Sequence, residues 1–280
     1  MLRVTSLIEN QSHSEELYAE HGLSLYIEKD DQHYLVDTGE TSRFMANALK
    51  MGIDLKKLDG VIITHNHSDH IGGLESLLEY NKDVKVYIKS AARSEFYYKK
   101  LFFKKYIGGA KELFSKYADR FIFVDDELRI AQDMILLSNT QMDKEYFCKD
   151  ASLLEKKQGL LVPDNFQHEL FLVIEQEQNV VIISSCSHNG VVNIVNTVKD
   201  KYRDKEISHI IGGFHMMGFG IRANNCSDDY IKEVAEILDQ SCKGVVHTCH
   251  CTGKPAYDIM RKHVGDKISY FDTGSKIVLR

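Results

Sequence analysis

Residues 58–70 read LDGVIITHNHSDH, and this stretch decides more about the fold than any other part of the chain. The apolar run at its start predicts a buried strand, and IGGLESLL at residues 71–78 predicts a helix after two glycines. His65, His67, Asp69 and His70 lie between the two. Zinc and iron accept imidazole and carboxylate ligands, and four such groups would be costly to bury without a cation. The stretch therefore predicts a metal site at the end of a strand, where α/β proteins often hold ligands.

Other ligand-type side chains also follow apolar strands. They are Cys186 and His188 after residues 180–183, His215 after 210–211, and His247 and His250 after 245–246. Such convergence is how a sheet builds one site from distant positions in the sequence. His215 follows a glycine pair and could bind substrate or move a proton, or it could lie in a structural turn. We expect Asp37 to orient a ligand histidine by hydrogen bonding.

Composition limits the classes of protein to consider. The chain has 280 residues, of which 43% are hydrophobic and 27% charged, and its net charge is −6. This charge gives no general attraction to nucleic acid or to an anionic membrane, and no apolar run approaches the roughly 20 residues that span a bilayer. The first residues alternate like a strand and lack the apolar core of a signal peptide. We expect one cytoplasmic domain over residues 1–280.

The segment of residues 91–118 mixes seven basic side chains with eight aromatic ones. An amphipathic helical insertion with solvated lysines would explain it, and so would a lid that gathers an anionic substrate. A surface that stacks nucleic-acid bases ranks lower. The hydrophobic pattern elsewhere predicts strands and helices in alternation, which favours a layered α/β sandwich.

The sequence resembles one known family. His-x-His-x-Asp-His after a strand is the signature of the metallo-β-lactamase-fold hydrolases, and Asp37-Thr38-Gly39 resembles an early turn of that fold. More narrowly, the motifs HGLS, CSHNG, GGFH and HCTG, which begin at residues 21, 186, 212 and 250, resemble the subfamily of metal-dependent hydrolases that includes dihydropterin ribofuranosyl-aminobenzene-phosphate synthases. The resemblance covers nearly the whole chain.

The resemblance implies a fold and a ligand set. The fold would be a four-layer αββα sandwich of the metallo-β-lactamase type. Two divalent metal ions would bind, zinc being the first choice and iron or manganese the alternatives. The ligands would be His65, His67 and His188 for one ion, and Asp69, His70 and His250 for the other. Many relatives have a bridging aspartate where this chain has Cys186, so thiolate ligation by Cys186 and ligation by His168 stay open.

The function expected from this site is hydrolysis of an ester, phosphoester or similar small-molecule substrate, anionic or phosphorylated in character. Metal-bound hydroxide would attack the substrate, while Asp69 or His215 accepts or returns the proton. Two alternatives stay open: an iron-dependent redox enzyme on the same fold, and a metal-dependent ligand-binding module without turnover. The sequence indicates neither the exact substrate nor the oligomeric state.

Overall fold

The computed structural model describes residues 1–148, 150–218 and 223–279. It divides into two compact units. Unit 1 comprises Met1–Val124, Ala151–His168 and Asp272–Arg280, and unit 2 comprises Asp125–Asp150 and Glu169–Phe271. Because the chain passes from unit 1 to unit 2 and back, neither unit is one continuous segment, and the sequence accordingly has no linker at a single boundary. A single metallo-β-lactamase-like domain over residues 1–280 stays a prediction.

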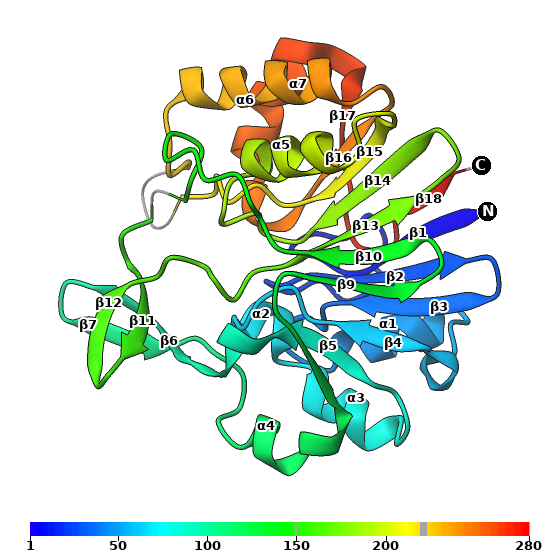
Figure 1. The fold of residues 1–280 in the computed structure, drawn as a ribbon, viewed down its shortest axis with the longest axis vertical. Helices are drawn as coiled ribbons and strands as arrows, with labels where there is room; N and C mark the ends of the chain where they lie inside the picture. Colours follow the sequence, from blue (N-terminus) through cyan, green and yellow to red (C-terminus); the bar gives the residue numbers. More distant parts are fainter. Residues whose placement is uncertain (149, 219–222, 280) are drawn as a thin grey trace. The chain divides into compact units, whose positions relative to one another are not determined.

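Unit 1 contains a seven-stranded sheet with the order β18-β1-β2-β3-β4-β5-β8 (Figure 1). The strands from β18 to β3 are antiparallel, and those from β3 to β8 are parallel. A tight turn at Asp30 and Asp31 joins β2 to β3. The strands are β1 (Leu2–Ile8), β2 (Ser24–Lys29), β3 (Gln32–Val36), β4 (Gly60–Ile62), β5 (Val86–Lys89), β8 (Phe121–Val124) and β18 (Lys276–Leu279).

Helices cover this sheet through one hydrophobic cluster. Helix α1 (Arg43–Lys50) contributes Phe44 and Ala48, and α3 (Leu74–Tyr80) contributes Leu74, Leu77 and Leu78. These residues recur at helical spacing, as the sequence predicted for the helix that follows the ligand loop. They pack against strand residues such as Val61 and Val86. The other α-helices in the described part of this unit are the short α2 (Ser68–Ile71) and α4 (Leu113–Lys116).

The helical insertion predicted for residues 91–118 is wrong for most of its length. Strands β6 (Glu95–Lys100) and β7 (Phe103–Tyr106) form a hairpin there, and only α4 is α-helical. The hairpin belongs to a four-stranded sheet of order β12-β11-β6-β7, with β11 (Leu153–Lys157) and β12 (Leu160–Pro163). Aromatic residues favour strands, and pairing of β6 with β11, about 55 residues away, supplies backbone hydrogen bonds that local patterning does not reveal.

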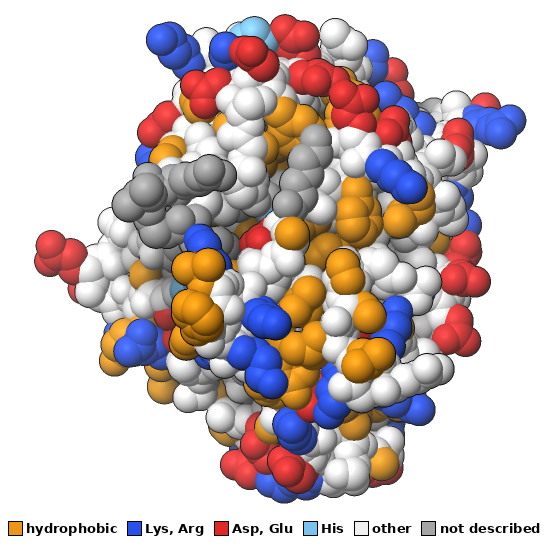
Figure 2. All heavy atoms as spheres, turned by 90° about the vertical axis from the view of Figure 1, so that its left-hand side faces the viewer, with side chains coloured by type: hydrophobic (Ala, Val, Ile, Leu, Met, Phe, Trp, Pro, Cys, Tyr) orange, Lys and Arg blue, Asp and Glu red, His pale blue; other side chains and the backbone are white. Residues whose placement is uncertain are grey.

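The tip of this hairpin exposes apolar and basic side chains together. Leu101 and Phe102 are almost fully exposed in the turn, and Lys99 faces Lys104 across it. Figure 2, drawn from the side on which Figure 1 places β7 and β12, shows hydrophobic and basic side chains adjoining one another. The basic and aromatic segment is therefore a β-hairpin surface rather than one face of a helix.

Unit 2 contains a second seven-stranded sheet, ordered β17-β16-β15-β14-β13-β10-β9. Here too one half is antiparallel, from β9 to β14, and the other half is parallel, from β14 to β17. The two units thus repeat one pattern of strand directions. The strands are β9 (Glu127–Ala131), β10 (Met134–Leu137), β13 (Phe171–Glu175), β14 (Asn179–Ser184), β15 (Glu206–Gly212), β16 (Val246–Thr248) and β17 (Ile268–Tyr270).

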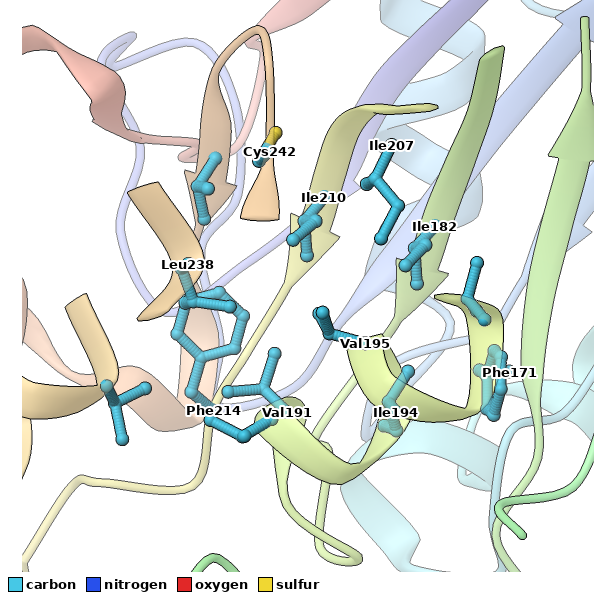
Figure 3. Close-up of a cluster of buried hydrophobic side chains, with 14 of the residues drawn as sticks. Phe171, Ile182, Val191, Ile194, Val195, Ile207, Ile210, Phe214, Leu238 and Cys242 are labelled. Carbon is cyan, nitrogen blue, oxygen red and sulfur yellow. The ribbon is translucent and has the colours of Figure 1, made fainter. Parts of the chain in front are cut away.

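Three helices, α5 (Val191–Lys201), α6 (Asp228–Ser241) and α7 (Lys254–Val264), cover one face of the unit 2 sheet (Figure 1). Ser227 caps the N-terminus of α6, where its hydroxyl accepts the backbone N–H of Tyr230, and two aspartates in the first turn complement the helix dipole. Figure 3 shows Val191, Ile194 and Val195 of α5 beside Ile182 and Ile210 of the sheet. Each unit therefore has the sheet and helix layer that half of the predicted sandwich requires.

No helix in the described part of the chain is both long enough and apolar enough to cross a membrane.

Candidate metal-binding clusters

In unit 1 the predicted ligand loop follows β4. The imidazoles of His65, His67 and His70 are buried, and the ring centroid of His65 lies 4.6 Å from that of His67 and 4.2 Å from that of His70. His65 offers a ring nitrogen within 4.8 Å of one on His67 and of one on His70. The strand and the short helix α2 thus bring together three of the histidines that the sequence singled out.

Asp37, at the end of the neighbouring parallel strand β3, holds this loop. Its Oδ1 accepts the backbone N–H of Thr64 at 2.7 Å, and its Oδ2 accepts the Thr64 hydroxyl at 2.8 Å. The same Oδ2 lies 2.8 Å from Nδ1 of His70, and the Thr64 hydroxyl lies 2.9 Å from Nδ1 of His65. With both Nδ1 atoms engaged in this way, a metal ion would bind each ring through Nε2. The prediction that Asp37 contacts a ligand-type histidine is confirmed.

The buried imidazoles differ in their electrostatics. Burial, together with the neighbouring His168, lowers the pKa of His67 to about 3, although Asp69 and Asp164 act in the opposite direction. Burial also opposes protonation of His70, but the carboxylates of Asp69 and Asp37 outweigh it and raise its pKa to about 10. His67 is therefore held in the neutral form that binds metal, whereas His70 lies in a site that already attracts positive charge.

Asp69 supplies a carboxylate beside the histidines. Its Oδ2 lies 3.5 Å from Nε2 of His70 and 3.3 Å from Nε2 of His21. The backbone carbonyl of Asp69 accepts the N–H of Leu23, and a Cβ at Gly22 would come within 2.7 Å of that carbonyl oxygen. The HGLS motif therefore packs against the ligand loop. The sequence flagged His21 only as part of a motif, and the geometry shows that it also contacts a candidate ligand.

His168, whose ligation of a metal the sequence left open, makes hydrogen bonds through both ring nitrogens. Its Nδ1 accepts the backbone N–H of Asn66 at 3.1 Å, and its Nε2 lies 3.0 Å from Oδ2 of Asp164. Its ring stacks on Phe96, with centroids 3.9 Å apart. Because hydrogen bonds engage both nitrogens, His168 is placed to fix the ligand loop rather than to bind metal. No pattern in the sequence pointed to Asp164.

The base of the β6–β7 hairpin is attached to the same loop. The backbone N–H of Ser68 donates to the carbonyl of Ile107 at 2.6 Å, and the N–H of Gly109 donates to the Asn66 side-chain oxygen at 2.8 Å. Asn66 also donates to the carbonyl of Ala92. The position between the two ligand histidines is thus occupied by a residue that connects the hairpin to the loop.

In unit 2 the turn after β14 carries Cys186 and His188, both buried. The carboxylate of Glu169 accepts the backbone N–H of His188 at 2.7 Å and that of Asn189 at 2.8 Å. The Asn189 side chain donates to the same carboxylate. Three N–H donors from this turn bind the buried carboxylate, so Glu169 fixes the turn.

The turns after β15 and β16 bring His215, His250 and Cys251 close to that segment of unit 2. Cys186, His250 and Cys251 offer ligand atoms within 4.8 Å of one another, and so do Cys148, His188 and His215. Burial raises the pKa of the Cys251 thiol, but hydrogen bonds with Cys186 and His215 and the nearby His250 hold it well below its usual range. The sequence grouped Cys186, His188, His215 and His250, whereas no pattern in it pointed to Cys148.

The donor sets fit metal ions. Unit 1 offers buried imidazoles with a carboxylate beside them, and unit 2 offers imidazoles with thiols, which are the ligands that zinc and iron accept. The outer partners Asp37 and Thr64 orient the rings as metal sites require. That His188 and His250 act with the unit 1 ligands stays a prediction from the resemblance.

Comparisons with known proteins place this chain among relatives of the metallo-β-lactamase superfamily. Residues 17–140 match the Metallo-beta-lactamase superfamily. An uncharacterised protein of Methanocaldococcus jannaschii is 27% identical over 250 residues, which cover 88% of this chain and 89% of that protein. The 7,8-dihydropterin-6-methyl-4-(beta-D-ribofuranosyl)-aminobenzene-5'-phosphate synthase of the same organism is 25% identical over 293 residues, covering 99% of this chain and 96% of the synthase.

The fold also matches a solved structure along its whole length. A metal-dependent hydrolase of the beta-lactamase superfamily superposes with a TM-score of 0.83 at 27% identity, covering 100% of this chain and 99% of that one. The described strands and helices therefore belong to the fold that the sequence predicted.

Proposed function

Because the chain carries a metallo-β-lactamase domain, we propose that it is a metal-dependent hydrolase with two divalent metal ions. The observation that carries the proposal is the ligand loop, in which three buried histidines are oriented by Asp37 and Thr64 with Asp69 beside them. Such a loop has little structural reason to bury three imidazoles in one place, whereas a bound cation would compensate the cost.

The proposed ligands are His65, His67, Asp69 and His70 in unit 1 and His188 and His250 in unit 2. When bound, the ions would supply Lewis acidity and an activated water, with zinc the first choice and iron or manganese the alternatives. Asp37 keeps His70 in the orientation in which Nε2 binds. Asp69 and His215 are the residues proposed to accept or return the proton of the reaction.

The proposed substrate is a small anionic or phosphorylated ester or phosphoester, in a cytoplasmic setting without a membrane or nucleic-acid partner. Support for this class comes from the relative whose name contains a ribofuranosyl 5'-phosphate, since it aligns with almost the whole chain. Condensation to a phosphorylated pterin conjugate, as in that relative's name, is a second candidate reaction for the same site. A panel of phosphoesters and a pterin-conjugate assay would separate the two.

Redox chemistry with iron is the other candidate, and the cluster of Cys186, His250 and Cys251 favours it because thiolates suit iron. Elemental analysis of protein purified anaerobically without added metal distinguishes the hydrolase from the redox enzyme. Zinc or manganese would support the hydrolase. Iron with a visible spectrum that changes on reduction would support the redox enzyme.

The central experiment compares the wild-type protein with a His65→Ala/His67→Ala variant. We expect about two metal ions per chain in the wild type and a sharp loss in the variant. His263→Ala is the control, because this histidine lies near the surface of α7 and pairs with Glu236. A wild-type protein that holds no metal and takes none up would overturn the proposal, and would leave a ligand-binding module without turnover.

A further inference from the structure

Unit 2 contains a group of ligand-type side chains that the predicted ligand set does not explain. Cys148, in the loop after β10, meets His188 and His215, which follow β14 and β15. The backbone N–H of Cys148 donates to the carbonyl of His188 at 2.9 Å, and this hydrogen bond attaches the loop after β10 to the turn after β14. The ring centroids of His188 and His215 are 4.3 Å apart.

The ligand atoms of these three side chains lie almost as close together as the ligand atoms around a coordinated metal ion. Their ligand atoms all lie within 4.8 Å of one another. Around a tetrahedral zinc ion with its usual bond lengths, the sulfur and nitrogen atoms would be roughly 3.3–3.6 Å apart. Small side-chain rotations would therefore bring the three groups onto one ion, and no strand or helix would need to move.

Two further observations at the same place point to a ligand. The Nε2 atom of His215 is buried and has no hydrogen-bond partner among the described residues. A cavity of about 20 Å³, which Cys148 and His215 both line, adjoins it. A single water or ion needs roughly 10–15 Å³, so the cavity accommodates one such group. Leaving a buried imidazole nitrogen without a partner destabilises a protein, and a bound ligand would remove that cost.

We propose that Cys148, His188 and His215 bind one divalent metal ion through a thiolate and two imidazoles. Binding would transfer the Cys148 thiol proton to solvent, because the thiolate is the form that ligates metal. One sulfur with two nitrogens selects zinc, cobalt or a similar ion over magnesium or calcium, which prefer oxygen. The inference touches the proposed function through His188: the two ligand sets are alternative assignments of that one imidazole, which donates a single lone pair to one ion.

Cobalt substitution tests the sulfur ligand directly. The wild-type protein loaded with Co²⁺ should show a thiolate-to-cobalt charge-transfer band, which Cys148→Ser should lose and His215→Gln should shift or weaken. Cys226→Ser is the matched control, since Cys226 is also a half-buried cysteine that lines the same cavity. Far-UV circular dichroism would verify that each variant is folded.

A second measurement uses the unaltered protein and so does not depend on the folding of any variant. In the metal-free protein iodoacetamide should alkylate Cys148, and adding Zn²⁺ should slow that alkylation at least tenfold. Mass spectrometry would follow Cys226 in the same sample, and its rate should change little. Equal rates at Cys148 with and without Zn²⁺ would overturn the inference.

The outcomes separate this inference from the proposed function. Cobalt bound without a charge-transfer band, or with a band that survives in Cys148→Ser, would overturn the Cys148 site and leave the hydrolase proposal in place. Failure of the wild-type protein to bind Co²⁺ or Zn²⁺ at all would overturn both.

Discussion

The Oδ2 atom of Asp37 lies 2.8 Å from Nδ1 of His70, and neither side chain is exposed to solvent. Asp37 ends one parallel strand, whereas His70 lies beyond the end of the next. The pair therefore ties the ligand loop to the sheet and fixes which ring nitrogen of His70 can bind a metal.

Replacing Asp37 with Asn tests this relationship. Asn tolerates the left-handed backbone of this position, where φ is 59°, and keeps the side-chain size, but it removes the negative charge. We expect metal affinity to fall by roughly 10–100-fold, as for other changes to the partners of ligand histidines. Competition with a chromophoric chelator would measure it. Asp59→Asn is the control, because Asp59 also accepts a backbone N–H, that of His33, but at an exposed position. Equal affinity in a folded Asp37→Asn protein would contradict the role given to Asp37.

His168→Gln distinguishes a residue that fixes the loop from one that binds metal. The change removes the ring that stacks on Phe96 and breaks the contact with Asp164, which is buried. We expect the free energy of unfolding to fall by about 2–4 kcal/mol, since a buried carboxylate loses its partner. Under saturating zinc the number of bound ions per chain should be unchanged. Loss of one ion per chain with little loss of stability would show that His168 is a ligand after all.

Stability should fall at acidic pH partly because of a histidine pair in unit 2. His209 and His247 stack with centroids 5.7 Å apart. Burial lowers the pKa of both, and that of His247 reaches about 4 with a further contribution from His209. Below pH 6.5 the unfolded chain binds protons that the folded His247 does not, so the folded state loses stability until the pH approaches 4. The loss from His247 is at most about 3 kcal/mol.

Urea unfolding of metal-free protein between pH 7 and pH 4 would measure this loss without interference from metal release. In His247→Gln the fall in unfolding free energy over that range should be clearly shallower than in the wild type. His13→Gln is the control, because His13 is largely exposed. Parallel curves for the wild type and His247→Gln would contradict the assignment.

Gly212 ends β15 just before the turn that carries His215. Its φ is 143°, and a Cβ there would lie 1.6 Å from the carbonyl oxygen of Ser184 on the paired strand. Because that contact is with backbone, Gly212→Ala should destabilise the protein by about 3 kcal/mol or more. Gly265→Ala is the matched control, since Gly265 also has a positive φ but nothing lies within 4 Å of the added carbon. Thermal unfolding of the two variants should show a much larger fall for Gly212→Ala.

Local patterns predicted most of the elements that carry the site. The apolar run before His65 is β4, the repeat after Gly73 is α3, and the strands before Cys186, His215 and His250 are β14, β15 and β16. These predictions succeeded because burial of one face imposes a period on the sequence whatever the rest of the chain does.

The sequence by itself determined the fold class and the clustering of His65, His67, Asp69 and His70, since neighbours on one short loop must lie close together. Only the tertiary structure decided what surrounds them. The hairpin at residues 95–106 depends on pairing with β11. His168 forms hydrogen bonds with Asn66 and Asp164. Cys148 lies close to His188 and His215. Each of these contacts joins residues far apart along the chain, and no local periodicity encodes such a distance.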